Sequence, residues 1–134
     1  MAAQFSDRIR NAWLDSNEAI TGVSPKLRIY SGSRPTNCAA SATGTLLAEI
    51  TCPSDWMAAV SSGAKVLAGS WTVAAIAAGT AGYYRLYDNA ATNCDEQGTI
   101  TATGGGGDLT VDNTSIASGQ TVTITAKTLT AGGA

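Results

Sequence analysis

The chain has 134 residues and a formal net charge of −2. This length suits one domain that buries roughly two-thirds of the surface exposed by the unfolded chain. It has no histidine and no lysine or arginine cluster, so the commonest general base and the basic stripe of a nucleic-acid-binding protein are missing. We therefore expect no nucleic-acid partner. We also expect no membrane association, because no apolar run approaches the roughly 20 residues of a membrane span.

The composition is rich in alanine, with 24 residues of this type. Alanine buries little area, and burial stabilises a fold by roughly 25 cal/mol per Å². The composition favours a fold supported from outside, by oligomerisation or by a larger surface, or a small sandwich with alanine packed between close sheets. The first ten residues, MAAQFSDRIR, lack the apolar segment of a signal peptide, so we expect synthesis and folding in a cytoplasm.

The first predicted element is a helix within residues 1–22, which we separate from a β-domain over residues 23–134. Ser6 is a suitable N-cap, and Gly22 is a suitable end. An apolar stripe recurs every four residues along this segment and consists of Phe5, Ile9 and Trp13. The stripe predicts either packing on the chain's own domain or docking on a neighbouring subunit.

After Pro25 the apolar residues alternate with polar ones, as in strands. Strands are expected within 26–31, 45–52, 64–77, 82–88, 97–103, 108–111 and 119–130. In the last of these, alternation places Val122, Ile124 and Ala126 on one face. Short strands separated by turn residues predict a mainly β fold, an antiparallel β-sandwich or jelly-roll-like barrel, with the helix at its N-terminal side.

Two irregular segments separate these strands. Residues 36–45 have few bulky side chains and are expected to form a long surface loop. Residues 104–107 are four glycines, but Asp108 and a strand follow them where a phosphate-binding loop needs a lysine and a helix. The glycine tract therefore predicts a hairpin tip.

No catalytic or metal-binding pattern is present. The acidic neighbours Asp95 and Glu96 would point to opposite faces of a strand, and the three cysteines lack the spacing of a zinc site. We expect no enzymatic activity and no cofactor.

The cysteines end two similar segments, RIYSGSRPTNC at 28–38 and RLYDNAATNC at 85–94. If both strands point the same way, their loops emerge at the same end and Cys38 can form a disulfide with Cys94. Such a bond would close a loop of about 56 residues and stabilise by roughly 4 kcal/mol. Cys52 would be a buried thiol or a link to another chain. The alternatives are a bond from Cys38 or Cys94 to a neighbouring subunit, and three free thiols.

The segments LRIYSGSRP, GTAGYYRLYD and SGQTVTIT, preceded by the capped helix, resemble a diverse group of small virion proteins of tailed bacteriophages. The resemblance covers nearly the whole chain and includes no catalytic motif, and the cysteines do not belong to it. It implies a structural β-sandwich protein of the virion, synthesised in the cytoplasm of the bacterial host. We expect a capsid decoration or cement protein that binds and stabilises the head shell.

The alternative is a tail-associated or fibre-associated structural protein that contacts the host surface. In either case the expected partners are the major capsid protein or other virion proteins, together with further copies of the chain in a homo-oligomer.

Overall fold

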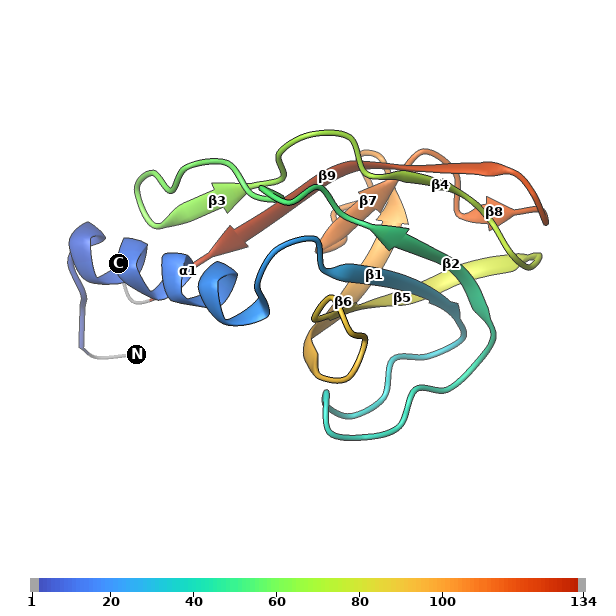
Figure 1. Cartoon of the computed structure of the whole chain (residues 1–134), viewed down its shortest axis with the longest axis horizontal. Helices are drawn as coiled ribbons and strands as arrows, with labels where there is room; N and C mark the ends of the chain where they lie inside the picture. Colours follow the sequence, from blue (N-terminus) through green and yellow to red (C-terminus); the bar gives the residue numbers. More distant parts are fainter. Residues whose placement is uncertain (1–2, 133–134) are drawn as a thin grey trace.

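A computed structural model describes residues 3–132 of the chain (Figure 1). Within these residues a single helix, α1 (Asp7–Thr21), precedes nine strands. These are β1 (Lys26–Ser31), β2 (Leu46–Thr51), β3 (Ala64–Val66), β4 (Thr72–Ala74), β5 (Gly79–Tyr87), β6 (Cys94–Ala102), β7 (Leu109–Val111), β8 (Ser115–Ile116) and β9 (Thr121–Thr130). The prediction of a mainly β fold with one N-terminal helix is confirmed. Residues 1–2 and 133–134, at the outer ends of the two predicted ranges, lie outside the described residues.

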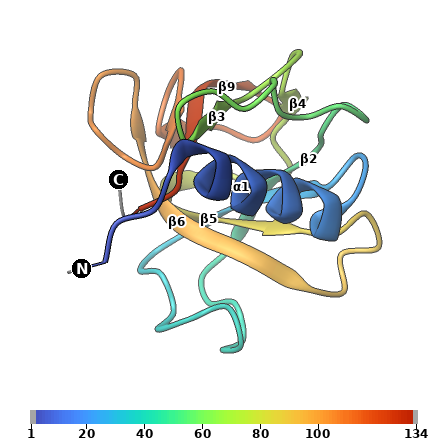
Figure 2. The same cartoon turned by 90° about the vertical axis from the view of Figure 1, so that its left-hand side faces the viewer.

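The strands form one curled sheet in the order β2-β1-β5-β6-β7-β9-β3, with β4 paired to β9 and β8 paired to β5. The curl produces two layers, with β1, β2, β5 and β6 in one and β3, β4, β7, β8 and β9 in the other (Figure 1). Strand β5 joins the layers because it pairs with β8 at Gly79 and with β1 and β6 further along. Helix α1 lies across one end of the layers (Figure 2).

The glycine tract does not form the predicted hairpin. Strand β7 runs parallel to β6. Residues 103–108 therefore return the chain to the level of Ile100, and β7 then runs beside β6 in the same direction. Gly104 and Gly106 have φ of +84° and +82°, which other residues rarely adopt. A Cβ on Gly105 or Gly107 would instead lie within 3 Å of Thr101 atoms. Two of the glycines are therefore required for their dihedral angles, and the other two because a side chain would collide with Thr101. The parallel pair also makes the sheet mixed, where an antiparallel sheet was expected.

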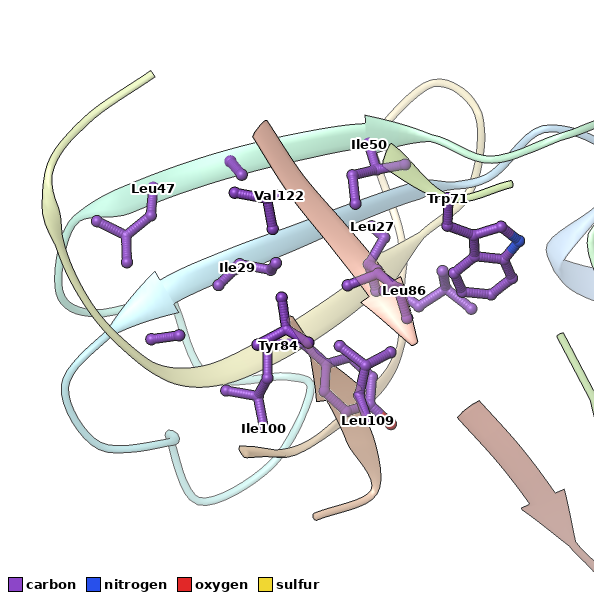
Figure 3. Packing of buried hydrophobic residues seen from close by; sticks show 14 of the residues in the cluster. Leu27, Ile29, Leu47, Ile50, Trp71, Tyr84, Leu86, Ile100, Leu109 and Val122 are labelled. Atoms are coloured by element: carbon purple, nitrogen blue, oxygen red, sulfur yellow. The ribbon is translucent and has the colours of Figure 1, made fainter. Parts of the chain in front are cut away.

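The hydrophobic core fills the space between the layers (Figure 3). Leu27, Leu86 and Val122 are fully buried in it, and the rings of Trp56 and Trp71 lie 6.2 Å apart. Among the described residues of this core cluster the only alanines are Ala48, Ala75 and Ala81. Most of the alanines therefore lie outside this core cluster, which is built mainly from larger apolar side chains.

The side-chain alternation of β9 contains an irregularity. Val111 pairs with Ile124 and Thr110 pairs with Ala126, so Thr125 is an extra residue in β9. This β-bulge exchanges the two faces of the strand beyond it. Ala126 is exposed, contrary to the prediction, and Lys127 is buried in its place.

Candidate functional site

The predicted apolar stripe lies on the outside of the molecule. Ile9 and Trp13 are 38% and 45% exposed, and Ile20, further along α1, is 78% exposed. Phe5 is partly buried because its ring packs edge-on against Trp13, at 4.9 Å between centroids. The structure thus places Ile9 and Trp13 on a face of α1 that remains largely uncovered within the described residues, and it places Phe5, two residues before the helix, against Trp13.

Polar contacts at its first turns hold α1 against the sandwich. Arg10 is buried and donates two hydrogen bonds to the Ala131 carbonyl, from Nε at 3.0 Å and from Nη2 at 2.7 Å. Its guanidinium lies close against Gly63, where an added Cβ would approach the central carbon to 2.4 Å. The Gly63 amide donates to Asn11 Oδ1 at 2.8 Å. The start of the helix is therefore fixed to the chain beside the ends of β3 and β9.

A second polar contact fixes the C-terminal half of the helix. Lys65 on β3 is 5% exposed, and its ammonium bonds Asp15 at 2.8 Å and also Glu18. Burial alone would lower the pKa of Lys65, but the hydrogen bonds to these two carboxylates outweigh burial and raise it. Trp56 Nε1 donates to the carbonyl of Gly22 at 2.9 Å, just past the helix end. The orientation of α1 is thus set by hydrogen bonds and ion pairs, and its apolar stripe remains uncovered.

The two similar cysteine segments meet by a route that the sequence did not indicate. Arg28 and Arg85 face each other as Cα partners in the antiparallel pair β1 and β5, so the two strands point in opposite directions. The premise of the disulfide prediction is wrong. The chain after β1 nevertheless folds back across the sheet, where Arg85 binds the carbonyls of Asn37 and Ala40 on either side of Cys38. This brings Cys38 close enough to affect the pKa of Cys94.

All three cysteines are free thiols in the structure. Burial, together with the neighbouring Cys38 thiol, raises the pKa of Cys94 to about 12. Cys52 is 2% exposed in the core, and burial raises its pKa to about 12. Cys52 is thus a buried thiol in this chain, the first of the two alternatives expected for it, and the Cys38–Cys94 disulfide stays a prediction.

The sequence reasoning missed a polar cluster beneath β9. Lys127 is 2% exposed, and its ammonium bonds the carboxylate of Glu96 and lies 3.3 Å from the Tyr84 hydroxyl. Tyr84 also donates to Glu96, and burial together with the Glu96 charge raises the pKa of this tyrosine, which keeps it a donor. The other oxygen, Glu96 Oε1, is buried and has no hydrogen-bond partner among the described residues.

This cluster forms the floor of a cleft of about 480 Å³ that also contains Asp108 and Gln97. The amine of Lys127 is engaged by Glu96 and Tyr84, so it is not available as a nucleophile. The available sequence signal was a single lysine inside the alternating strand TVTITAKTLT, in a chain with eight basic residues.

At one side of this cleft Asp108 fixes the loop that joins β6 to β7. Its Oδ2 accepts hydrogen bonds from the Thr99 amide at 2.9 Å and from the Thr99 hydroxyl at 3.0 Å. The bond from the Thr99 amide is the main reason that the pKa of Asp108 is lowered from its usual 3.8. The ionised carboxylate therefore stabilises the folded state.

We expect Asp108→Asn to lower the free energy of unfolding at neutral pH. Because the folded pKa lies below 3.8, the stabilisation is fully present above that pH and disappears as the pH falls through the folded pKa. Urea unfolding of both proteins between about pH 7 and pH 2 checks this expectation. Asp95→Asn, which removes the same charge from an exposed position, is the control. A difference between wild type and Asp108→Asn that persists unchanged at the acid end would contradict the assignment.

Comparison of the chain with protein-family models, with curated proteins and with solved structures finds no match. Within residues 3–132 no group of three or more acidic, cysteine or histidine side chains is placed to hold a metal ion. No helix among these residues is long and apolar enough to cross a membrane. The exposed stripe on α1, on a helix that Arg10 and Lys65 hold in place, is the candidate site that the geometry supports best.

Proposed function

We propose that the protein is a structural component of a tailed-bacteriophage virion that binds and stabilises the head shell, with α1 as its point of attachment. The observation that carries the proposal is an apolar stripe in which Ile9 and Trp13 are exposed on a helix fixed by buried polar contacts, and Phe5, just ahead of the helix, packs on Trp13. A helix held in one orientation loses little further conformational freedom when it binds. Its apolar face is then available to a partner instead of to its own core.

The proposed partner is the major capsid protein or another virion protein, with further copies of the chain as a homo-oligomer around the same contact. Tryptophan is enriched among the side chains that dominate interface energies, which makes Trp13 the expected anchor. The resemblance of the chain to small virion proteins adds support from the sequence, independently of the exposure of the helix.

We expect Ile9→Asp combined with Trp13→Asp to weaken attachment to particles at least about 30-fold, because truncating a central anchor at an interface costs about 2 kcal/mol or more. Both side chains are exposed, so the folded state should be retained. The measurement is co-sedimentation of purified protein with heads that lack it, with circular dichroism of each variant.

Ile76→Asp is the matched control, because Ile76 is 61% exposed and lies outside α1. This control should bind as wild type. Equal binding by the double variant and by wild type would exclude the stripe as the attachment surface. Locating the bound protein by electron microscopy then distinguishes a head protein from the tail or fibre alternative.

A further inference from the structure

The long connection between β1 and β2 covers the outer face of the sheet. Residues 32–45 fold back beneath β5 and β6, on the side opposite the core (Figures 1 and 2). On this outer face Tyr30 and Tyr83 stack at 5.1 Å, and Arg85 is only 2% exposed. The connection, which we call the strap (residues 32–45), is therefore the cover of a face that would otherwise be open to solvent.

The strap is held by a few polar contacts. Arg85 Nη2 donates to the carbonyls of Asn37 at 3.2 Å and Ala40 at 2.7 Å. The Tyr83 hydroxyl donates to the Thr43 carbonyl at 2.6 Å and accepts from the Thr43 amide at 2.9 Å. Gln97 Nε2 also donates a hydrogen bond to the strap, at 2.8 Å from the Pro35 carbonyl oxygen.

No residue of the strap is itself buried; each is exposed or partly exposed. Segments without buried apolar contacts open at low free-energy cost relative to global unfolding. The hydrogen bonds from Arg85, Tyr83 and Gln97 thus set the position of the strap without giving it the stability of the core. A covalent bond at this place would change the local opening of the strap much more than it changes its conformation.

The structure places a cysteine pair at this point. Cys38 lies between Asn37 and Ala40, whose carbonyls bind Arg85, and Cys94 begins β6 opposite Tyr87. Gln97, three residues after Cys94 on β6, also binds the strap, at the Pro35 carbonyl. The Cys94 thiol donates to the Glu96 carbonyl at 3.5 Å, and the Cys38 thiol is close enough to be one cause of the raised pKa of Cys94. Both side chains are partly exposed. Cys52 is enclosed in the core, out of reach of external reagents.

We propose that Cys38 and Cys94 form an oxidation site for low-molecular-weight disulfides, and that the product is a covalent clasp that closes the strap over the outer face of β5 and β6. The site is independent of the attachment proposed for α1. In a cytoplasm both thiols would stay reduced, and the disulfide would form when the protein reaches a more oxidising medium.

The reaction is a pair of thiol–disulfide exchanges in which the external disulfide is the oxidant. In the first, the Cys38 thiolate attacks one sulfur of that disulfide, which forms a mixed disulfide and releases one thiolate. In the second, Cys94 loses its proton to solvent and attacks Cys38 Sγ, which releases the second thiolate. The released thiolates take up the two protons, so two cysteine thiols and one external disulfide give one internal disulfide and two external thiols.

The order of attack follows from the surroundings of the pair. Burial and the Cys38 thiol raise the pKa of Cys94 to about 12, which makes it a poor first nucleophile, while the Arg85 charge acts in the opposite direction. Cys94 is already beside Cys38 when the mixed disulfide forms, and this proximity favours the second step.

The test uses the purified full chain, incubated with oxidised or with reduced glutathione. Intact mass, alkylation and peptide mapping should show a monomer that has lost two hydrogen atoms, with Cys38 linked to Cys94 and Cys52 alkylated only after unfolding. Amide hydrogen exchange within residues 36–45 should slow by at least about tenfold in the oxidised protein. The matched control Cys52→Ser should behave as wild type, whereas Cys38→Ser should show neither change.

Three results would overturn the proposal: a disulfide-linked dimer, a stable mixed disulfide with glutathione, or three alkylated cysteines after oxidation. Formation of the Cys38–Cys94 bond without slower exchange in the strap would also overturn it, because the clasp would then have no effect on the cover. The mass and mapping measurements need only the wild-type chain, so a variant that fails to fold does not affect the outcome. Failure of attachment through α1 would leave all of these results unchanged.

Discussion

Glu96→Leu is expected to lower the free energy of unfolding by about 3–5 kcal/mol, because it leaves a buried cation without its partner. Lys127 is 2% exposed, and its ion pair is with Glu96. The same substitution removes the acceptor of the buried Tyr84 hydroxyl. Chemical denaturation of the variant and of wild type measures the difference in the free energy of unfolding, and the slope of this free energy against denaturant concentration should be the same for both.

The double variant Glu96→Leu with Lys127→Met should recover most of the lost stability, because replacing a whole buried ion pair by apolar side chains is often neutral. Lys26→Met is the surface control, since the Lys26 ammonium makes an exposed hydrogen bond to Thr51. A loss of less than about 1 kcal/mol in Glu96→Leu would show that Lys127 finds another carboxylate, for which Asp108 in the same cleft is a candidate.

Gly82→Ala is expected to cost about 3 kcal/mol or more, because there is no room for a methyl group at this position. A Cβ on Gly82 would lie 1.9 Å from the carbonyl oxygen of Gly32. The contact arises at a β-bulge, where Gly82 is the extra residue of β5 between the pairs Tyr30–Tyr83 and Ser31–Ala81. The backbones of β5 and of the first strap residue approach each other too closely for any side chain.

Thermal and chemical unfolding of Gly82→Ala measures the effect, and Gly132→Ala is its control. Gly132 has no atom within 4 Å of an added Cβ, so this second substitution should change stability little. If both variants unfold at the same denaturant concentration, the close approach of the two backbones at Gly82 does not exist in solution. An insoluble Gly82→Ala chain beside a soluble Gly132→Ala chain would agree with the expected loss.

The local features of the fold could be predicted because local chemistry decides them. Ser6 caps α1 by accepting from the Ile9 amide, and Gly22 ends the helix at a φ of +86°, as the sequence indicated. The strand predicted at 26–31 has the bounds of β1, although Tyr30 is buried as well as its neighbour Ile29. Alternation alone could not reveal the bulge at Thr125, because a bulge depends on the register of two paired strands.

The candidate site was only partly predictable for the same reason. The spacing of four residues predicts that Phe5, Ile9 and Trp13 lie on one side. The exposure of these side chains, however, depends on what the opposite side of α1 binds. That side is fixed by Arg10 and Lys65, whose partners lie far away in the sequence. The cysteine pair likewise depends on the path of the strap across antiparallel strands, which no pattern in either segment specifies.

The contact between Arg10 and the Ala131 carbonyl joins residues 121 positions apart, and it sets an order of events during translation. Helix α1 is synthesised first, whereas the end of β9 that receives it is synthesised last of the described elements. Until the end of β9 has been synthesised, Arg10 lacks the Ala131 carbonyl, and β3, which carries Lys65, lacks the strand with which it pairs. A nascent chain therefore cannot hold α1 in its final orientation, and the proposed recognition of a partner through this helix would have to wait until β9 has been made.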